Sequence, residues 1–205
     1  MPKPAQFWND RFATEEFVYG EAPNQFVASA AGAWLPDAAT VLTLGAGEGR
    51  NAVYLARQGH SVTALDYSTE GLAKTRRLAD AAGVTVDPLH ADVRSWTPDR
   101  TWDAVVTTFL HLPPDERPAF YRLIQQCLRP GGLLVAEWFR PEQRTDGYTS
   151  GGPPEVDMMV TADELRQHFA ADGIERLAVE TPVLDEGPYH SGPAATVRVV
   201  WRKTG

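Results

Sequence analysis

Apolar runs of strand length alternate along the chain with stretches whose apolar residues recur at helical spacing. The runs predict strands at 41–44, 61–65, 84–89, 102–107 and 133–138, with two closing strands at 174–183 and 194–201. Helical spacing predicts helices at 50–58, 70–82, 118–128 and 162–171. Near-continuous apolar strands are typical of a parallel sheet that is covered on both faces. The pattern therefore predicts an α/β fold in which helices alternate with strands.

The first strand runs directly into a glycine-rich loop, residues 45–49, and then into a helix that begins at Arg50. Such a loop lets the backbone approach a ligand closely, and the free N–H groups of the helix N-terminus suit a nucleotide or a carboxylate. A dinucleotide fingerprint, GxGxxG, would need glycine at position 50, so that pattern does not fit. An ordinary strand-to-helix turn is the alternative interpretation of the loop alone.

Asp66 ends the second strand about 20 residues beyond the loop, where a carboxylate can accept hydrogen bonds from ribose hydroxyls. It could instead cap the next helix near Ser68 and Thr69. The charged residues of that helix, Lys74, Arg76 and Arg77, are expected to be solvated. Asp66 thus favours a nucleoside ligand without specifying which one.

Residues 108–114, TFLHLPP, follow the fourth strand at the edge of the sheet where ligands bind in open α/β folds. His111 is the candidate to orient or deprotonate a nucleophile there, because the ordinary pKa of histidine lies near neutral pH. A histidine between two leucines is equally consistent with packing. Residues 1–36 carry many aromatic residues and are expected to form a helical cap.

Several segments in order along the chain resemble the class I S-adenosylmethionine-dependent methyltransferases. The loop GAGEG at 45–49 resembles their motif I, and LRPGGLL at 128–134 follows at a family-like interval. FWNDRFATEEFVYGEAPNQFV at 7–27 and DEGPYHSGPAATVRVVWRK at 185–203 resemble small bacterial members related to the tellurite-resistance and thiopurine S-methyltransferase families. The resemblance covers nearly the whole chain.

The resemblance implies a three-layer Rossmann-like sandwich. Its seven-stranded, mostly parallel sheet would have the order 3-2-1-4-5-7-6, with strand seven antiparallel. Residues 1–205 would form a single methyltransferase domain, and residues 1–36 would form a lid over the cofactor.

S-adenosylmethionine is the implied cofactor, with S-adenosylhomocysteine as product and no metal. In this family an acid at the position of Asp92 accepts from the adenine amine, although Asp92 could instead cap the turn at 94–97. The cofactor-binding positions carried over are Trp8, Tyr19, Gly45, Ala46, Gly47, Arg50, Asn51, Asp66, Tyr67, Asp92, Val93 and Thr108.

The implied reaction moves a methyl group to a small-molecule nucleophile such as a thiol or chalcogen oxyanion, with His111 or Arg11 positioning it. Tyr189 and His190 could reach the site, although a histidine at a hairpin tip is more often solvent-exposed. Thr43 stands where motif I usually has an acid. A noncatalytic S-adenosylmethionine-binding sensor or scaffold is therefore the main alternative, and an NAD-dependent oxidoreductase is a lesser one.

Net charge and composition indicate which partners and which cellular location to expect for the protein. The formal net charge of −8 opposes binding to nucleic acid or to an anionic membrane. The one cysteine, Cys127, lies in an apolar helical pattern and is expected in the core. The N-terminus lacks an apolar signal region, and no window is long and apolar enough for a membrane span. These features predict a cytoplasmic protein, either a monomer or a homodimer.

Overall fold

The computed structural model describes residues 3–204, which build one seven-stranded sheet and a separate two-stranded hairpin. The large sheet has the order β3-β2-β1-β4-β5-β9-β6, and only β9 runs antiparallel to its neighbours. Its strands are β1 (Thr40–Leu44), β2 (Ser61–Asp66), β3 (Asp87–His90), β4 (Trp102–Thr108), β5 (Leu128–Phe139), β6 (Ile174–Glu180) and β9 (Thr196–Arg202). The predicted fold and strand order are confirmed, with β9 as the predicted seventh strand.

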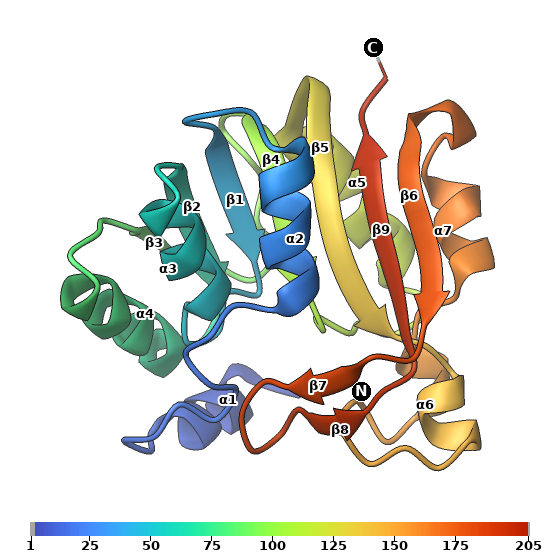
Figure 1. Cartoon of the computed structure of the whole chain (residues 1–205), viewed down its shortest axis with the longest axis horizontal. Helices are drawn as coiled ribbons and strands as arrows, with labels where there is room; N and C mark the ends of the chain where they lie inside the picture. Colours follow the sequence, from blue (N-terminus) through green and yellow to red (C-terminus); the bar gives the residue numbers. More distant parts are fainter. Residues whose placement is uncertain (1–2, 205) are drawn as a thin grey trace.

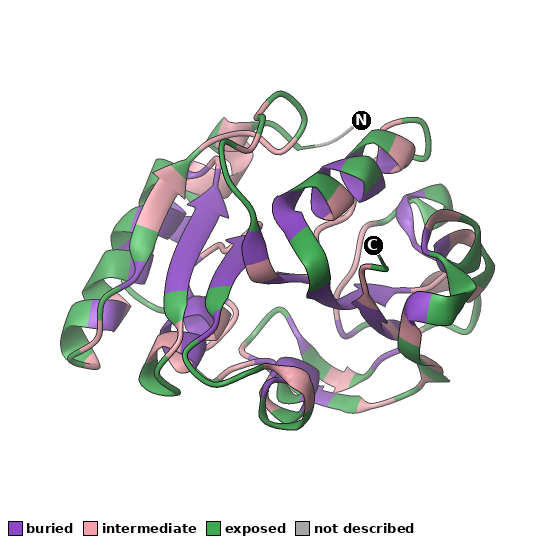
Figure 2. Ribbon diagram, turned by 90° about the horizontal axis from the view of Figure 1, so that it is seen from above, coloured by how far each residue is buried: buried purple, intermediate pink, exposed green. Residues whose placement is uncertain are grey.

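Helices cover both faces of this sheet and complete three layers (Figure 1). One face carries α2 (Gln25–Trp34), α3 (Arg50–Arg57) and α4 (Thr69–Ala81), and the other carries α5 (Arg117–Cys127) and α7 (Ala162–His168). Figure 2 shows the buried residues concentrated in the strands and on the helix faces that turn toward them. Cys127, the last residue of α5, is fully buried, as expected.

A separate two-stranded hairpin was not predicted. Strands β7 (Val183–Asp185) and β8 (Ser191–Pro193) form where the end of the predicted strand 174–183 and the link to the strand 194–201 were expected. Their residues carry no long apolar run, because the pair packs below the main sheet rather than within it. Short pieces α6 (Glu142–Thr145), η1 (Val156–Met158) and η2 (Ala171–Gly173) lie in the loops after β5 and α7.

Residues 3–24, here called the N-terminal segment, lie across the carboxyl ends of the parallel strands together with the hairpin (Figure 1). The segment contains α1 (Ala5–Phe12), which packs against α4. Within the predicted lid, residues 1–36, α2 buries Phe26, Val27, Ala30 and Ala31 in the helical layer on the sheet, and the lid role itself stays a prediction. Residues 1–2 lie outside the described part of the chain.

A buried carboxylate in the glycine loop holds the N-terminal segment in place. Glu48 accepts hydrogen bonds from the backbone N–H groups of Val18 and Tyr19, both at 3.2 Å. Its Oε1 also lies 2.7 Å from the ammonium of Lys74, which in turn donates to the carbonyl of Glu16 at 2.6 Å. The expectation that Lys74 is solvated is wrong, because the N-terminal segment covers this face of α4.

The hairpin holds the same segment from the other side. Gly187, at φ +83°, approaches so closely that a Cβ there would lie 2.4 Å from the backbone nitrogen of Gly20. A side chain could be accommodated only by moving the backbone of one of the two segments. The glycine loop and the hairpin therefore clamp residues 18–20 between them.

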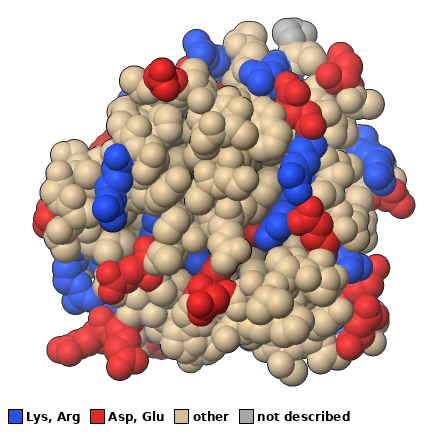
Figure 3. Space-filling view, viewed as in Figure 1, with Lys and Arg blue, Asp and Glu red and all other residues tan. Residues whose placement is uncertain are grey.

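On the face seen in Figure 3, acidic and basic side chains are intermixed, and neither kind forms an extended charged patch. Among residues 3–204, no helix combines the length and the apolar character that a membrane crossing requires.

Replacing Glu48 with Gln tests the contact between the glycine loop and the N-terminal segment. Because the change leaves the buried ammonium of Lys74 without its charge partner, we expect a loss of roughly 3 kcal/mol in the free energy of unfolding. We also expect faster thermolysin cleavage within residues 13–20, followed by mass spectrometry. Glu70→Gln, an exposed carboxylate on α4, is the matched control; equal behaviour of the two variants would contradict the assignment.

Candidate active site

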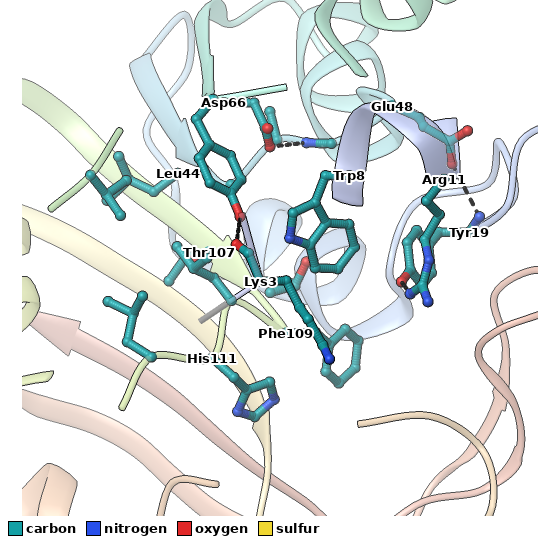
Figure 4. Close-up of a pocket in the computed structure, with 18 of the residues that line it drawn as sticks. Lys3, Trp8, Arg11, Tyr19, Leu44, Glu48, Asp66, Thr107, Phe109 and His111 are labelled. Carbon is teal, nitrogen blue, oxygen red and sulfur yellow. Dashed lines mark hydrogen bonds between the residues drawn. The ribbon is translucent and has the colours of Figure 1, made fainter. Parts of the chain in front are cut away.

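A cavity of about 370 Å³ lies at the carboxyl ends of β1, β2 and β4, beneath the N-terminal segment (Figure 4). Parallel strands in register end together, so the loops that follow them meet at this edge. The cavity is lined by every site residue predicted from the sequence: Trp8, Arg11, Tyr19, Gly45, Ala46, Gly47, Arg50, Asn51, Asp66, Tyr67, Asp92, Val93, Thr108 and His111. Their locations agree with a common site, while their individual roles stay predictions.

Asp66 pins the glycine loop to the end of β2. Its Oδ2 accepts from the backbone N–H of Gly47 at 2.7 Å, and its Oδ1 accepts from that of Ser68 at 2.8 Å. Burial raises the pKa of this carboxyl, while the backbone N–H groups of Ser68, Gly47 and Tyr67 oppose the rise. A carboxylate has about four acceptor positions, so two remain for ribose hydroxyls. The helix cap itself is Ser68, whose hydroxyl accepts from the N–H of Gly71.

Asp92 binds Arg94, two residues further along the chain. Its carboxylate accepts from both the backbone N–H and the guanidinium of Arg94, and this pairing lowers the pKa of Asp92. The turn-capping alternative is therefore what the structure contains, and an adenine amine would have to share the carboxylate with Arg94. Trp96 packs toward Trp102 at the edge of the core and does not line the cavity.

Arg50 and Asn51 open α3 directly after the glycine loop. Arg50 is only 7% exposed; its Nη2 donates to Glu186 at 2.6 Å, and its Nη1 is buried with no hydrogen-bond partner among the described residues. Asn51 donates through Nδ2 to the hydroxyl of Thr108 at 3.1 Å. A buried guanidinium N–H without a partner fits the carboxylate of an amino acid, which is the group at one end of S-adenosylmethionine.

Aromatic rings form the other half of the cavity. Phe109, directly after β4, stacks on Phe139 with ring centroids 4.5 Å apart, and the ring of His190 meets Phe109 edge-on at 4.5 Å. Phe109 has φ +55°, a left-handed conformation that is costly for a phenylalanine and often marks functional positions. This half of the cavity is suited to an apolar or flat ligand.

Arg11 is surrounded by rings at the same end of the cavity. Its guanidinium carbon lies 4.6 Å from the ring centroid of Phe7 and 4.7 Å from that of Tyr189, and its Nη1 donates to the Tyr19 hydroxyl at 3.0 Å. Contacts of this kind hold a cation in place without neutralising it. Arg11 can therefore attract and orient an anionic group.

His111 is poorly placed to act as a base. Its Nδ1 lies 3.1 Å from the carbonyl of Met158, and its Nε2 accepts from the backbone N–H of Phe139 at 3.4 Å, so the tautomer with hydrogen on Nδ1 satisfies both contacts. Burial lowers the pKa of His111 to about 3. The geometry favours the packing interpretation, with His111 forming part of the cavity wall.

His190 is buried, although a histidine at a hairpin tip was expected to be exposed to solvent. It is 6% exposed and lines the cavity, whereas its neighbour Tyr189 is 48% exposed. The β7–β8 hairpin folds back under the sheet, so its turn faces the site rather than solvent. Burial lowers the pKa of His190, and its Nδ1 lies 3.9 Å from Glu186.

Three further polar residues that support the site were not singled out from the sequence: Asn24, Glu48 and Glu186. Glu48 carried a usable signal, since a charged residue between two glycines of a tight loop is unusual. Asn24 showed only the ordinary signal of a helix cap. Glu186 could not be found, because its partner Arg50 is 136 residues away in the sequence.

Residues 3–204 contain no cluster of three or more His, Cys, Asp or Glu side chains able to hold a metal ion. The absence of a metal stays a prediction. The arrangement offers a nucleoside-sized half under the glycine loop and an aromatic half with one cation.

Comparison with known proteins gives a family match for the centre of the chain. Residues 41–132 match the family described as "Methyltransferase domain". A Haemophilus influenzae protein named probable S-adenosyl-L-methionine-dependent methyltransferase TehB is 28% identical over 100 residues, covering 47% of this chain and 35% of that protein. Probable thiol methyltransferase 2 of Arabidopsis thaliana is 27% identical over 153 residues, covering 72% of this chain and 63% of that protein.

The match in structure extends further than the match in sequence. The crystal structure of TehB from Haemophilus influenzae superposes with a TM-score of 0.72 at 18% identity, covering 98% of this chain and 67% of that one. This likeness supports the fold, including the N-terminal segment and the closing strands. The chain spans 35% and 63% of the length of the two curated relatives. Residues 41–132 are therefore similar to a methyltransferase domain, and the fold of the chain is that of the solved methyltransferase-like structures it superposes on.

Proposed function

We propose that the protein transfers a methyl group from S-adenosylmethionine to a small thiol or chalcogen anion. The observation that carries this proposal is that one cavity joins the glycine loop and Asp66 on one side to an aromatic half holding Arg11 on the other. The names of the two curated relatives, one a thiol methyltransferase, are consistent with such an acceptor. The cavity size suits a small molecule better than a macromolecule.

The cofactor would be held by residues whose hydrogen-bonding groups and charges already suit its parts. Asp66 would accept from the ribose, the glycine loop would lie against the nucleoside, and the free Nη1 of Arg50 would bind the carboxylate. When bound, S-adenosylmethionine supplies an electrophilic methyl group that an acceptor takes by in-line displacement of a neutral thioether. Holding the two reactants in line can contribute about 7–11 kcal/mol without any proton transfer.

The weakness of the two histidine bases in the cavity favours one class of acceptor. Burial lowers the pKa of both histidines of the cavity, that of His111 to about 3, which makes them weaker bases than a free imidazole. An alcohol or amine acceptor would need a group to take its proton, whereas a thiol, with a pKa of about 8.5, is already a few per cent ionised at neutral pH. Arg11 would favour that anion over its neutral form.

The predictions about domain organisation, partners and location also belong to this proposal. Residues 1–205 would act as one methyltransferase domain, and the N-terminal segment would cover the bound cofactor. We also expect a small-molecule partner, no binding to nucleic acid, a monomer or homodimer, and a cytoplasmic location.

Thr43 supports one competing function, a noncatalytic S-adenosylmethionine-binding protein. This residue is buried, and its hydroxyl donates weakly to the carbonyl of Thr63 at 3.4 Å, so it brings no charge to the cavity. Binding of S-adenosylhomocysteine without methyl transfer to any of a panel of small thiols, selenols and chalcogen oxyanions would favour that alternative.

The pH dependence of methyl transfer separates self-ionising acceptors from base catalysis. With two thiols of similar size but different pKa, we expect kcat/KM to rise about tenfold per pH unit and to level off at each thiol's own pKa. The measurement is product formation by mass spectrometry between pH 5 and 9. An inflection at the same pH for both thiols would instead indicate a base on the protein.

Replacing Arg11 with Gln tests the orienting cation. Loss of one charge-assisted contact to the thiolate should raise the KM for the thiol about tenfold, while the Kd of S-adenosylhomocysteine changes little. Arg57→Gln, an exposed cation on α3, is the control that removes a charge away from the cavity. An unchanged KM in the Arg11 variant would remove this residue from the site.

A further inference from the structure

Asn24 lies at the centre of a buried hydrogen-bond network behind the cavity. Its side chain is fully buried, and its Nδ2 donates to Glu137 at 2.7 Å and to Glu186 at 2.9 Å. Its Oδ1 accepts from the backbone N–H of Val27 at 2.9 Å and thereby caps α2. Both hydrogens of the amide are used, so Asn24 joins α2, β5 and the hairpin without a free donor.

The network ends on the two residues that open α3. Glu186 accepts from Nη2 of Arg50 at 2.6 Å, and the backbone N–H of Asn24 donates to Oδ1 of Asn51 at 2.9 Å. Arg50 and Asn51 both line the cavity, whereas Asn24 does not. Asn24 therefore contacts the supports of the site and not the site itself.

The charges explain why an amide occupies this position. Glu137 is balanced by Arg198, whose Nε donates at 2.6 Å, and Glu186 is balanced by Arg50. A neutral amide gives each acid a hydrogen bond while adding no charge. Aspartate of the same shape would place a third buried carboxylate between two others, which is strongly unfavourable.

Arg50 cannot turn freely while this arrangement holds. One arm of its guanidinium is fixed on Glu186, which is itself fixed by Asn24, and the planar fork then determines where Nη1 lies. Nη1 is the buried N–H with no partner among the described residues. Its direction is thus set by residues from the N-terminal segment and the hairpin, far from α3 in sequence.

We propose that Asn24 is a positioning residue for the amino-acid end of the cofactor, acting through Glu186 on Arg50 and through its backbone on Asn51. The inference rests on the proposed function, because it takes the carboxylate of S-adenosylmethionine as the partner of Arg50. It adds that affinity for this end of the cofactor depends on a residue that never touches it.

The test compares two ligands that share a nucleoside. S-adenosylhomocysteine carries the amino-acid group, and 5′-methylthioadenosine has the same adenosine thioether without it. For Asn24→Ser, which keeps a capping hydroxyl, titration calorimetry should show the Kd of S-adenosylhomocysteine raised about tenfold or more. The Kd of 5′-methylthioadenosine should stay within about threefold, because the nucleoside half of the site is intact.

Two further variants separate positioning from general damage. Asn24→Ala also loses the cap of α2; the same ligand selectivity in both variants would assign the effect to the network rather than to the cap. Glu186→Gln, which leaves Asn24 in place, tests the next link of the network: an unchanged Kd of S-adenosylhomocysteine in this variant would overturn the role of Asn24 even if the Asn24 variants do not fold. In turnover, the KM for S-adenosylmethionine should rise while kcat at saturation changes little.

The outcomes are distinct. Equal weakening of both ligands, or no weakening of either, in variants that melt cooperatively would overturn the role of Asn24 and leave the proposed function standing. Wild-type protein that binds neither ligand would overturn the proposed function, and this inference with it.

Discussion

The shared register of β1, β2 and β4 is the constraint on which the site depends. Leu44 pairs with Leu65, and Thr43 pairs with Val106, so the three strands end at one edge of the sheet. The loops that follow these strands therefore lie close together, and each brings short polar or glycine residues to a common cavity. The N-terminal segment and the hairpin then close this edge from outside (Figure 1).

Buried carboxylates hold those loops in position. Asp66 fixes the glycine loop to β2, Glu48 fixes the N-terminal segment to the glycine loop, and Glu186 fixes Arg50 to the hairpin. Each acid is compensated by backbone N–H groups or by a cation, as a buried charge requires. The polar residues around the cavity thus form a support whose parts come from both ends of the chain.

The chemistry of the cavity follows from what this support leaves available. Among residues 3–204, Nη1 of Arg50 has no hydrogen-bond partner, Arg11 is held among aromatic rings, and burial lowers the pKa of both histidines. Such a site can bind, orient and exclude water, but it offers little proton transfer. Methyl transfer to an acceptor that is already ionised fits these properties.

The sequence by itself determined the α/β class, the main strands and helices, and Asp66 and His111 as candidates near the glycine loop, because these depend on local spacing and on the rule that parallel strands end together. The resemblance supplied the strand order. Only the tertiary structure decided the environment of each side chain: Lys74 is buried, His190 faces the cavity and His111 bonds to backbone on both sides. These outcomes depend on contacts such as Arg50 with Glu186, whose partners lie more than a hundred residues apart and leave no local pattern.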